Sequence, residues 1–533
     1  MGKYLNPGNE AFIRNTKKNY IDKTGMIEIV NDTIGSSQNL TCISRPRRFG
    51  KSFAAQMLCA YYDCSCDSHD LFDQYEIHKS DSYEEHINRY NVILIDVAGF
   101  ISTVKQSDEQ QKMSGIPGMI IKSIREDMIR MFPELSDIPQ FEDCLLKCVE
   151  ITGHKFVFII DEWDALIREA KGDGKLHEAY LHLLRGLFKN ANLTPYVVAA
   201  AYMTGILPIK KDGSQSALSD FWEYSILDPD GYTKYTGFTE NETKKICDQY
   251  NMDFEEAKRW YDGYSIGDVE SVYNPYSLMQ AMNRRKYCSY WKYTSAADAL
   301  ETYISMNFDG LHEDVLRLIA GEELEVRTDG FKNDLTSFQN KDDVLTLMIH
   351  LGYLTYDAET EFARIPNEEI RTEFVKLLEC GQTPHFAELV RASQKLLQDT
   401  LAGNSDAVVE AIERVRKSNY APAYYNNEQA LRSVIKFAYV ICMDKYMKVE
   451  ELPSGTGIAD VVFIPKRKTP DPAMIVELKW NKSSDAAISQ IRNQDYPAAL
   501  ENYGGEIVLV GINYNDKTKE HTCRIERIVK YTS

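Results

Sequence analysis

The sequence of 533 residues predicts an α/β fold in three parts: a parallel-sheet domain, a mostly helical middle region and a smaller α/β domain. Short apolar runs alternate with helical patterns over the first ~230 residues, which is typical of a parallel sheet covered by helices. Helical patterns dominate the middle, and strand-like runs return near the end. Because a chain of this length suggests about three or four domains, we place the parts at residues 1–235, 236–400 and 401–533.

Continuous apolar runs, rather than alternating ones, mark the strands of the first part, as expected when helices cover both faces of a sheet. The last part shows a different order: helix, short strand, two longer strands, helix and strand. The expected strands of the first part are residues 39–44, 92–97, 156–161 and 196–203. The expected elements of the last part are a helix at 427–447, strands at 448–452, 458–465 and 473–480, a helix at 484–501 and a strand at 506–512.

Composition excludes several classes of protein. No apolar run approaches the ~20 residues of a membrane-spanning helix, and the first residues lack a signal-peptide core, so we expect a cytoplasmic protein that does not enter a membrane. The 11 cysteines lack the paired spacing of a zinc site, which indicates reduced thiols. The net charge of −19 argues against a surface coated for nucleic-acid binding. Residues 428–533, however, hold 15 Lys and Arg against 14 Asp and Glu, which suits a different partner.

A candidate phosphate-binding loop follows the first expected strand and precedes a helical pattern. The P-loop motif is Gly, four residues and Gly-Lys-Ser/Thr, and here Arg45 replaces the first Gly. Backbone N–H groups at the helix start would bind phosphate. Lys51 would reach the β- and γ-phosphates, and the Ser52 hydroxyl would bind Mg²⁺. The candidate nucleotide-binding residues are Arg45, Pro46, Arg47, Arg48, Phe49, Gly50, Lys51 and Ser52.

Two carboxylates end the expected strand at residues 156–161, which is the pattern of a Walker B strand. Asp161 would hold Mg²⁺, and Glu162 would polarise the attacking water as a general base. Thr204 ends a further strand, where it is a candidate sensor of the γ-phosphate or a cap of the strand end. The two halves together predict an NTP site at the ends of parallel strands.

A second constellation lies in the last part of the chain. Glu477 and Lys479 are two residues apart on an expected strand, so their side chains leave the same face. Asp460 is on the strand before, from which it can converge with Glu477 on one divalent cation. Lys479 would position the nucleophilic water and stabilise the charge that develops on phosphate. This is the Asp…Glu-x-Lys arrangement of metal-dependent phosphodiester hydrolysis, although a Glu-x-Lys pair is also a common surface salt bridge.

Two further residues are candidates for the same site. Glu428, on the expected helix before the strands, would add a carboxylate to the metal. Gln490, on the helix after them, would orient a phosphate or Lys479. The order of elements around the acids is the one expected for such a nuclease.

Nearly the whole chain resembles a bacterial family of AAA-ATPase-like proteins with a C-terminal PD-(D/E)XK nuclease domain. The resemblance implies a P-loop domain of the AAA/ASCE type, a restriction-endonuclease-like domain and ATP binding. The family's phosphate loop is similar to Arg45-Pro-Arg-Arg-Phe-Gly-Lys-Ser52, so Arg45 belongs to the family pattern. The other matching stretches are Tyr20-Ile-Asp-Lys-Thr24, Phe158-Ile-Ile-Asp-Glu-Trp-Asp164, Gly455-Thr-Gly-Ile-Ala-Asp460, Ile475-Val-Glu-Leu-Lys479 and Ala487-Ile-Ser-Gln-Ile-Arg-Asn-Gln-Asp-Tyr496.

The chain departs from this family at one position and matches it through three motifs without a chemical role. The family commonly shows Gly-x-Gly-Arg-x-Asp, whereas Ile458 stands here at the Arg, which removes one phosphate contact and keeps the metal ligands. In the middle region the matching motifs are Trp260-Tyr-Asp-Gly-Tyr264, Tyr273-Asn-Pro-Tyr276 and Ile365-Pro-Asn-Glu-Glu369. We interpret these as helix-packing and turn residues.

Two functions fit the sequence. One is an ATP-regulated or ATP-driven nuclease that uses Mg²⁺, or Mn²⁺ at the nuclease site, and acts on nucleic acid, with DNA favoured over RNA. The alternative is a nucleotide-switched binding or signalling protein whose nuclease fold recognises nucleic acid or a protein without cutting. ATPases of this class often place an arginine finger at a subunit boundary, so a homo-oligomer is also expected. Arg47 and Arg48 are poor candidates for that finger because they lie in the phosphate loop itself.

Overall fold

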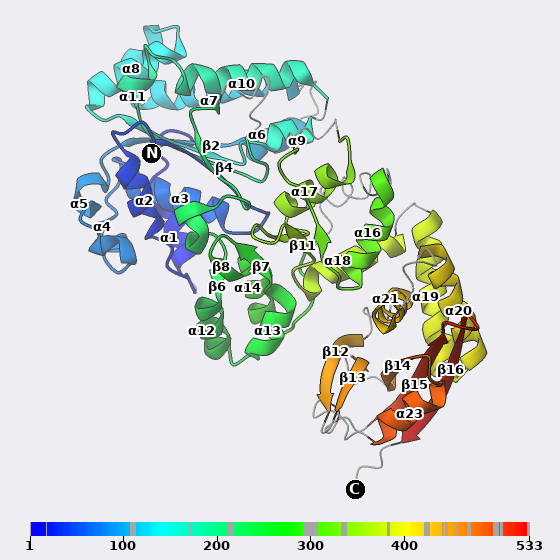
Figure 1. The fold of residues 1–533 in the computed structure, drawn as a ribbon. Coiled ribbons are helices and arrows are strands. Elements are labelled where there is room, and N and C mark those ends of the chain that lie inside the picture. Colours follow the sequence, from blue (N-terminus) through cyan, green and yellow to red (C-terminus); the bar gives the residue numbers. More distant parts are fainter. Residues whose placement is uncertain are drawn as a thin grey trace. The chain divides into compact units, whose positions relative to one another are not determined.

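A computed structural model of the chain shows two compact units (Figure 1). The N-terminal unit comprises residues 1–292 and 325–370, and the C-terminal unit comprises residues 293–324 and 371–533. The expected middle region, residues 236–400, therefore contributes to both. The structure describes residues 2–17, 19–106, 113–170, 172–209, 218–291, 304, 307–331, 338–380, 384–419, 427–439, 442, 446–454, 457–465, 471–493, 500 and 505–529.

A five-stranded parallel sheet forms the core of the N-terminal unit, which confirms the predicted parallel-sheet domain. Its order is β2-β3-β4-β1-β5. β4 begins two residues after the predicted start, because Pro195 opens a short helix, Thr194–Val197, and proline suits a first helical turn. The strands are β1 (Leu40–Ser44), β2 (Asn91–Asp96), β3 (Phe156–Asp161), β4 (Val198–Gly205) and β5 (Trp222–Tyr224), of which β5 is not among the predicted ones.

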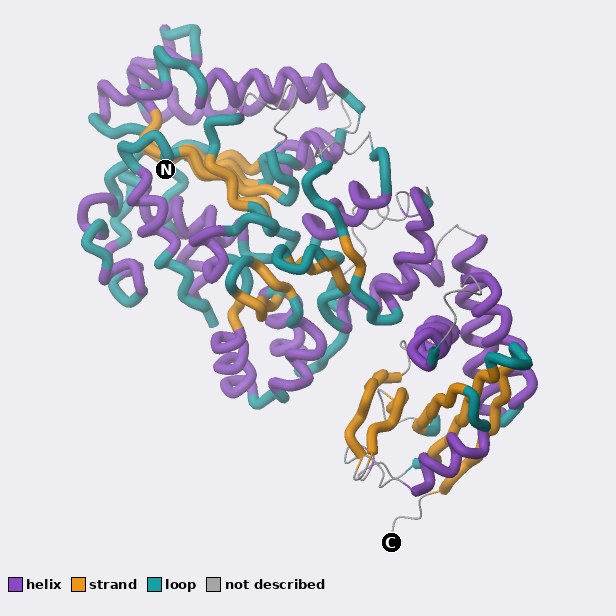
Figure 2. Tube along the Cα trace, viewed as in Figure 1, coloured by secondary structure: helices purple, strands orange, loops and turns teal. Residues whose placement is uncertain are grey.

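Helices cover both faces of this sheet (Figures 1 and 2). Apolar side chains of α1 (Glu10–Thr16), α2 (Met26–Thr33) and α3 (Lys51–Tyr62) pack on one face. Those of α6 (Val97–Gln106), α7 (Ile116–Met131), α8 (Phe141–Thr152) and α10 (Gly174–Phe188) pack on the other. The short helices are α4 (His69–Phe72), α5 (Tyr83–His86), α9 (Ala165–Glu169), α11 (Thr194–Val197), η1 (Glu76–Lys79), η2 (Met113–Gly115), η3 (Pro133–Asp137) and η5 (Asp230–Tyr235).

The middle of the chain adds helices and two small sheets. One sheet has the order β6-β8-β7 and the other β10-β11-β9. Thr239 and Glu242 form a capping box that starts α12. The elements are β6 (Phe238–Thr239), α12 (Glu240–Tyr250), α13 (Phe254–Tyr261), β7 (Tyr264–Ile266), β8 (Val269–Tyr273), α14 (Pro275–Arg284), η6 (Phe308–Gly310), α16 (Leu311–Ile319), β9 (Leu324–Glu325), α17 (Lys341–Leu351), β10 (Thr355–Asp357), β11 (Phe362–Arg364) and α18 (Glu368–Cys380).

The C-terminal unit contains a mixed sheet in the order β12-β13-β14-β15-β16. Only β14 and β15 are parallel, and α23 (Ser484–Asn493) connects them. Side chains of α23 pack on one face of the sheet, and those of three helices pack on the other. The other elements are α19 (Pro384–Ala402), α20 (Ser405–Asn419), α21 (Glu428–Ala438), β12 (Tyr446–Ser454), β13 (Gly457–Pro465), β14 (Ala473–Trp480), β15 (Glu506–Asn515) and β16 (Glu520–Val529).

This sheet matches the predicted second α/β domain and adds β16, which is not among the predicted strands.

Two observations bear on the expectations from composition. The ten cysteines whose side chains are described are all free. Among the described helices, none combines the length and apolar character needed to cross a membrane.

His350, a buried histidine of α17, makes the folded state sensitive to acid. Its Nδ1 has no hydrogen-bond partner among the described residues, and burial lowers its pKa from 6.5 to about 4. The folded state therefore disfavours the protonated ring. The contribution of the neutral His350 ring to the free energy of unfolding is fully present above about pH 6.5. It is lost as the pH drops toward about 4, by up to about 1.4 kcal/mol per pH unit.

We expect His350→Leu to reduce this acid sensitivity. The measurement is the urea midpoint of the N-terminal unit at about pH 7.5 and about pH 5.5, in the wild type and in the variant. His182→Leu, at an exposed position of α10, is the control. An equal loss of midpoint in wild type and His350→Leu would contradict the assignment.

Candidate nucleotide and nuclease sites

The parallel sheet brings the predicted nucleotide-binding residues to one edge. β1, β3 and β4 are neighbours and run in the same direction, so their carboxyl ends meet. The phosphate loop, residues 45–50, follows β1 at this edge. Asp161 is the last residue of β3, and Thr204 is the residue before the last in β4. β4 lies between the strand of the loop and the strand of the acids, so Thr204 is next to both.

The phosphate loop ends at Gly50, whose φ of +88° favours glycine, and α3 begins at Lys51. The Lys51 ammonium is buried and donates to two carbonyls of the loop, Arg45 O at 2.8 Å and Pro46 O at 2.7 Å. Burial lowers the pKa of Lys51 to about 8, against the opposing effect of Glu162 and Asp161. The loop thus carries a partly desolvated ammonium beside the N-terminus of a helix, a combination that attracts phosphate.

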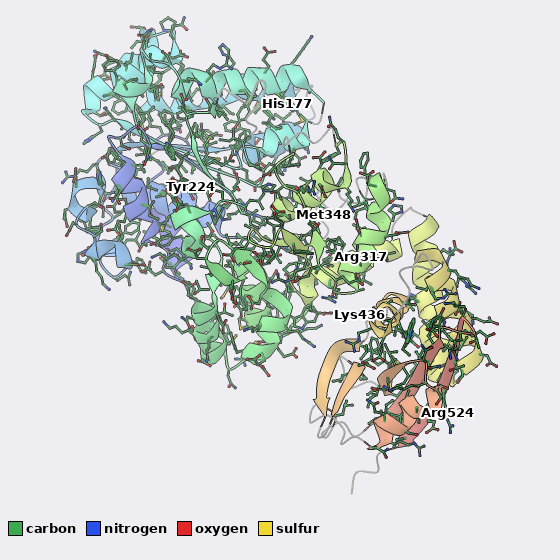
Figure 3. The ribbon with its side chains drawn as sticks, in the orientation of Figure 1. His177, Tyr224, Arg317, Met348, Lys436 and Arg524 are labelled. Carbon is green, nitrogen blue, oxygen red and sulfur yellow. The ribbon has the colours of Figure 1, made fainter. Side chains whose placement is uncertain are left out.

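Arg45 points into the protein. Its side chain is fully buried, and its guanidinium donates to Thr236 Oγ1 at 3.0 Å and to the carbonyl of Tyr224 at 2.8 Å. Tyr224 lies on the edge strand β5 and is labelled in Figure 3. Burial lowers the pKa of Arg45 to about 10. These contacts stabilise the conformation of the loop from its inner side, although Arg45 is among the candidate nucleotide-binding residues that the sequence predicts.

The other loop residues lie in three environments. Arg47 is half-buried, and burial, with Arg168 nearby, lowers its pKa against the pull of Glu162. Phe49 is buried and its ring contacts Tyr264 at 5.1 Å between centroids. Pro46 is buried against Gly352, where an added Cβ would lie 2.7 Å from that of Pro46. Ser52, at the start of α3, is exposed.

The acids at the end of β3 are fixed by Thr204. The buried Thr204 hydroxyl donates to Asp161 Oδ1 at 2.5 Å and accepts from the backbone N–H of Glu162 at 3.2 Å. Glu162 has φ +52°, which is unusual for a residue with a Cβ and is a conformation found at functional sites. Asp161 and the exposed hydroxyl of Ser52 supply the oxygen ligands that Mg²⁺ prefers, so the residues present fit this cation.

The sequence predictions miss one arginine at this site, Arg168 of α9. Its Nε donates to Asp164 Oδ2 at 2.7 Å, and its Nη2 lies 3.3 Å from Glu162 Oε2. Asp164 is itself buried and accepts the backbone N–H groups of Ile206 and Leu207. Burial acts to lower the pKa of Arg168, but the ion pairs outweigh it and raise that pKa. The spacing of four residues between Asp164 and Arg168 on a helix is the only sequence signal for this contact.

In the C-terminal unit, β14 buries two charged residues on the face covered by α23. Glu477 is 1% exposed and Lys479 is 7% exposed, and Lys479 Nζ lies 2.8 Å from Glu477 Oε1. Leu478 points to the opposite core, as the alternation of a strand predicts. Asp460 Oδ2 accepts the backbone N–H of Leu478 at 2.8 Å, which brings its carboxylate to the same strand.

Glu477 has the properties of a metal ligand. Its Oε2 is buried and has no hydrogen-bond partner among the described residues. Burial raises the pKa of Glu477 above its ordinary value, the nearby Asp460 adds to this, and Lys479 opposes it. An unpaired buried carboxylate oxygen is costly, and a divalent cation would satisfy it. Asp460 and Glu477 therefore fit a shared Mg²⁺ or Mn²⁺.

The remaining candidates of this site lie as follows. Arg432, one turn after Glu428 on α21, pairs with Asp460 at 2.5 Å, and it is not among the predicted residues. Gln490 is half-buried on α23, between Ile488 and Ile491, which pack on the sheet. Among the described residues, no group of three or more His, Cys, Asp or Glu side chains gathers to hold a metal ion.

Parts of the predicted signatures lie outside the described residues. These are Gly455 and Thr456, residues 466–470 of the basic turn, and Gln494, Asp495 and Tyr496. For Ile458 only the backbone, in β13, is described.

Comparison with known proteins assigns a class to each of the two domains that carry these residues. Residues 9–214 match the family model described as predicted AAA-ATPase, and residues 426–523 match that of the PD-(D/E)XK nuclease superfamily. The chain therefore joins a predicted AAA-ATPase domain to a PD-(D/E)XK nuclease superfamily domain, which confirms the resemblance of its motifs.

Similar proteins cover most of the chain at low identity. An uncharacterized protein in the vnfD 5′ region of Azotobacter chroococcum mcd 1 is 22% identical over 512 residues, 93% of each chain. Among solved structures, the Walker-type ATPase PABY2304 of Pyrococcus abyssi matches with a TM-score of 0.32 and 14% identity, covering 67% of this chain and 97% of that one. The Aeropyrum pernix ORC2 protein matches with a TM-score of 0.32 and 11% identity, covering 68% and 96%.

Proposed function

We propose that this protein is an ATPase coupled to a metal-dependent DNA nuclease. The observation that carries the proposal is the buried Glu477–Lys479 pair, whose Glu477 Oε2 has no partner among the described residues. The same chain holds the Gly-Lys-Ser end of a P-loop and the two acids of a Walker B strand. A buried charge without full compensation destabilises the fold. A catalytic role explains why both charges stand on a strand whose other residues are apolar.

At the nucleotide site, each residue has a defined task. The N–H groups at the start of α3 and the Lys51 ammonium would bind the phosphates of ATP. Ser52 and Asp161 would hold Mg²⁺, and Thr204 fixes the orientation of Asp161 through its hydrogen bond. Glu162 would then polarise the attacking water. Arg168 would support this step, because its guanidinium pairs with the carboxylates of both Asp164 and Glu162 and so fixes the position of Glu162.

At the nuclease site, Asp460 and Glu477 would bind the cation, which supplies Lewis-acid stabilisation of the phosphate. Water and a phosphate oxygen would complete the coordination, since Mg²⁺ commonly keeps several waters. Lys479 lies beside Glu477 and would stabilise the charge that develops on the phosphate. Glu428 and Gln490 stay candidates for a further metal ligand and a phosphate contact. We further propose DNA as the substrate and a homo-oligomer as the working state.

One observation favours the second function, a nucleotide-switched binding protein that does not cut. Asp460 is paired with Arg432, and only two carboxylates of the described residues converge at this site. A cationic side chain on a metal ligand competes with the metal. In this case the fold would bind nucleic acid or a protein partner in response to nucleotide.

DNA cleavage by the full-length protein distinguishes the two functions. Linear and circular DNA are incubated with Mg²⁺ or Mn²⁺, with and without ATP. Cleavage that depends on the metal and changes with ATP supports the coupled nuclease. Cleavage at the same rate with and without ATP contradicts the proposed coupling of the two domains. ATP hydrolysis without cleavage of any substrate, and without Mn²⁺ binding to the C-terminal unit, supports the switched binding protein.

Arg168→Ala is expected to slow ATP hydrolysis with little change in KM for ATP. The substitution frees the Glu162 carboxylate and removes the ion pair of Asp164, while Asp164 keeps its two backbone donors. Loss of general-base orientation predicts a decrease in kcat of about tenfold to a hundredfold. Arg168→Lys should recover part of the rate.

The control for this prediction is Arg130→Ala, an exposed arginine of α7 that pairs with Asp127. Steady-state ATPase kinetics check the result. An unchanged kcat in a folded Arg168→Ala protein would show that Arg168 does not position Glu162.

A further inference from the structure

The three motifs without a chemical role surround the phosphate loop. Asn274 of the Tyr-Asn-Pro-Tyr motif lies 3.5 Å from the carbonyl of Arg47. Tyr264, which ends the first motif, packs on Phe49 and donates to the carbonyl of Gly352 at 2.8 Å. Asn367 of the third motif donates to the carbonyl of Asp262 in the first at 2.7 Å. All of these residues belong to the N-terminal unit. Three segments that are far apart in the sequence therefore pack together around the phosphate loop.

Arg48 is the loop residue that these motifs hold. Its guanidinium lies 4.5 Å from the centre of the Tyr276 ring and 5.9 Å from that of Trp291. Its Nη1 donates to the carbonyl of Tyr290 at 2.6 Å. Among the described residues, no carboxylate is within ion-pair distance of Arg48. A cation held by a carbonyl and two ring faces keeps its charge uncompensated, so a phosphate can draw it away.

Glu369 fixes the peptide that holds Arg48. This carboxylate is 1% exposed, and its Oε1 accepts the backbone N–H of Tyr290 at 2.6 Å and that of Trp291 at 3.0 Å. Hydrogen bonds from N–H groups to a buried carboxylate are stronger than those between neutral groups. The position of the Tyr290 carbonyl, and with it that of Arg48, therefore depends on Glu369.

The same residues stand where the chain passes between units. The chain leaves the N-terminal unit after residue 292, directly beyond Trp291, and again after residue 370, directly beyond Glu369. The Glu369 carboxylate thus links the two segments of the N-terminal unit that end at these points. The peptide that it binds, Tyr290-Trp291, in turn contacts Arg48 of the phosphate loop.

We propose that Glu369 is a positioning residue that acts on Arg48 through Tyr290 and Trp291, and that it transmits nucleotide occupancy of the phosphate loop to both exit points of the chain. The proposal rests on the nucleotide binding proposed above and adds the route of its coupling. When phosphate draws Arg48 from the Tyr290 carbonyl, the peptide at 290–291 changes its environment. Glu369 conveys that change to the start of α18.

Hydrogen exchange of the full-length protein tests this route. The probe is a non-hydrolysable ATP analogue with Mg²⁺ at saturating concentration. In the wild type we expect the analogue to change exchange in peptides covering residues 45–56, 287–291 and 365–371, by about fivefold or more at the latter two. In Glu369→Ala, peptide 45–56 should still respond, while the responses at 287–291 and 365–371 are lost. The Kd for the analogue should rise by about threefold to tenfold, the effect of losing one or two hydrogen bonds.

Two further variants sharpen the test. Glu369→Gln keeps an acceptor oxygen and should recover part of the response. It also serves if Glu369→Ala does not fold. Glu368→Ala, the neighbouring glutamate of the same motif, is the matched control and should behave as the wild type.

Two results would overturn the proposal, and they differ from a failure of the proposed function. A wild type that responds at 45–56 but not at 287–291, or a Glu369→Ala protein that keeps the response there, excludes the route while nucleotide binding stands. A wild type that responds in no peptide and does not bind the analogue overturns the nucleotide function and the route with it.

Discussion

Lys51→Ala is expected to abolish ATP binding and hydrolysis, with a loss of at least about a hundredfold in kcat/KM. Lys51 is the only lysine of the motif at residues 45–52, and its buried ammonium donates to the carbonyls of Arg45 and Pro46. Its removal takes away the charge that is proposed to bind the phosphates and leaves those two carbonyls without their donor. Equilibrium binding of a fluorescent ATP analogue and steady-state ATPase kinetics measure the effect.

Two comparisons make this result specific. Lys51→Arg keeps the charge but needs more room in a buried pocket, so it should also lose most activity. Lys105→Ala, an exposed lysine that pairs with Glu169, should change nothing. Near-wild-type hydrolysis by a folded Lys51→Ala protein would place the ATP site elsewhere in the chain.

Glu477→Gln is expected to abolish DNA cleavage and weaken Mn²⁺ binding in a protein that still folds. The amide has nearly the shape of the carboxylate, but it lacks the charge that a cation requires. The substitution removes a buried anion whose Oε2 has no partner among the described residues, but it also takes the charged partner from the buried Lys479 ammonium. We therefore expect the urea midpoint to fall while the protein still folds. Loss of both cleavage and Mn²⁺ binding in a folded variant is the pattern expected of a metal ligand.

The measurements are cleavage of plasmid DNA, Mn²⁺ binding by electron paramagnetic resonance and the urea midpoint of the full-length protein. Lys479→Met should also lose cleavage, yet it should keep metal binding, because the proposed role of Lys479 is to stabilise the phosphate rather than to hold the metal. Glu506→Gln, a partly exposed carboxylate of β15 that pairs with Arg527, is the control. Unchanged Mn²⁺ binding in Glu477→Gln would remove Glu477 from the metal site.

Local patterns predict the central strands and the spacing of residues on them. The apolar run at 156–161 forms β3 with the predicted bounds, and Glu477 and Lys479 share a face of β14 as the period of a strand requires. These features depend only on residues close in sequence. The short strand β5 escapes prediction because three residues hold too little pattern, and β16 escapes because its alternation of apolar and polar residues is interrupted at Arg527 and Ile528.

Contacts between segments that are distant in the sequence could not be predicted from such local patterns. The direction of the Arg45 side chain depends on Tyr224 and Thr236, which are some 180 residues or more away in the chain. Arg432 faces Asp460 because helix α21 packs beside β14. The convergence of three middle motifs on the phosphate loop similarly needs the packed fold.

The sequence by itself determined the class of each domain, the strand ends that carry Asp161 and Glu477, and the loop that carries Lys51, because motif spacing and apolar periodicity are local properties of the chain. Only the tertiary structure decided the partners of these residues: Thr204 on Asp161, Arg168 on Glu162, Arg432 on Asp460 and Glu369 behind Arg48. Each of these contacts joins separate elements, and the packing of the core selects which side chains meet.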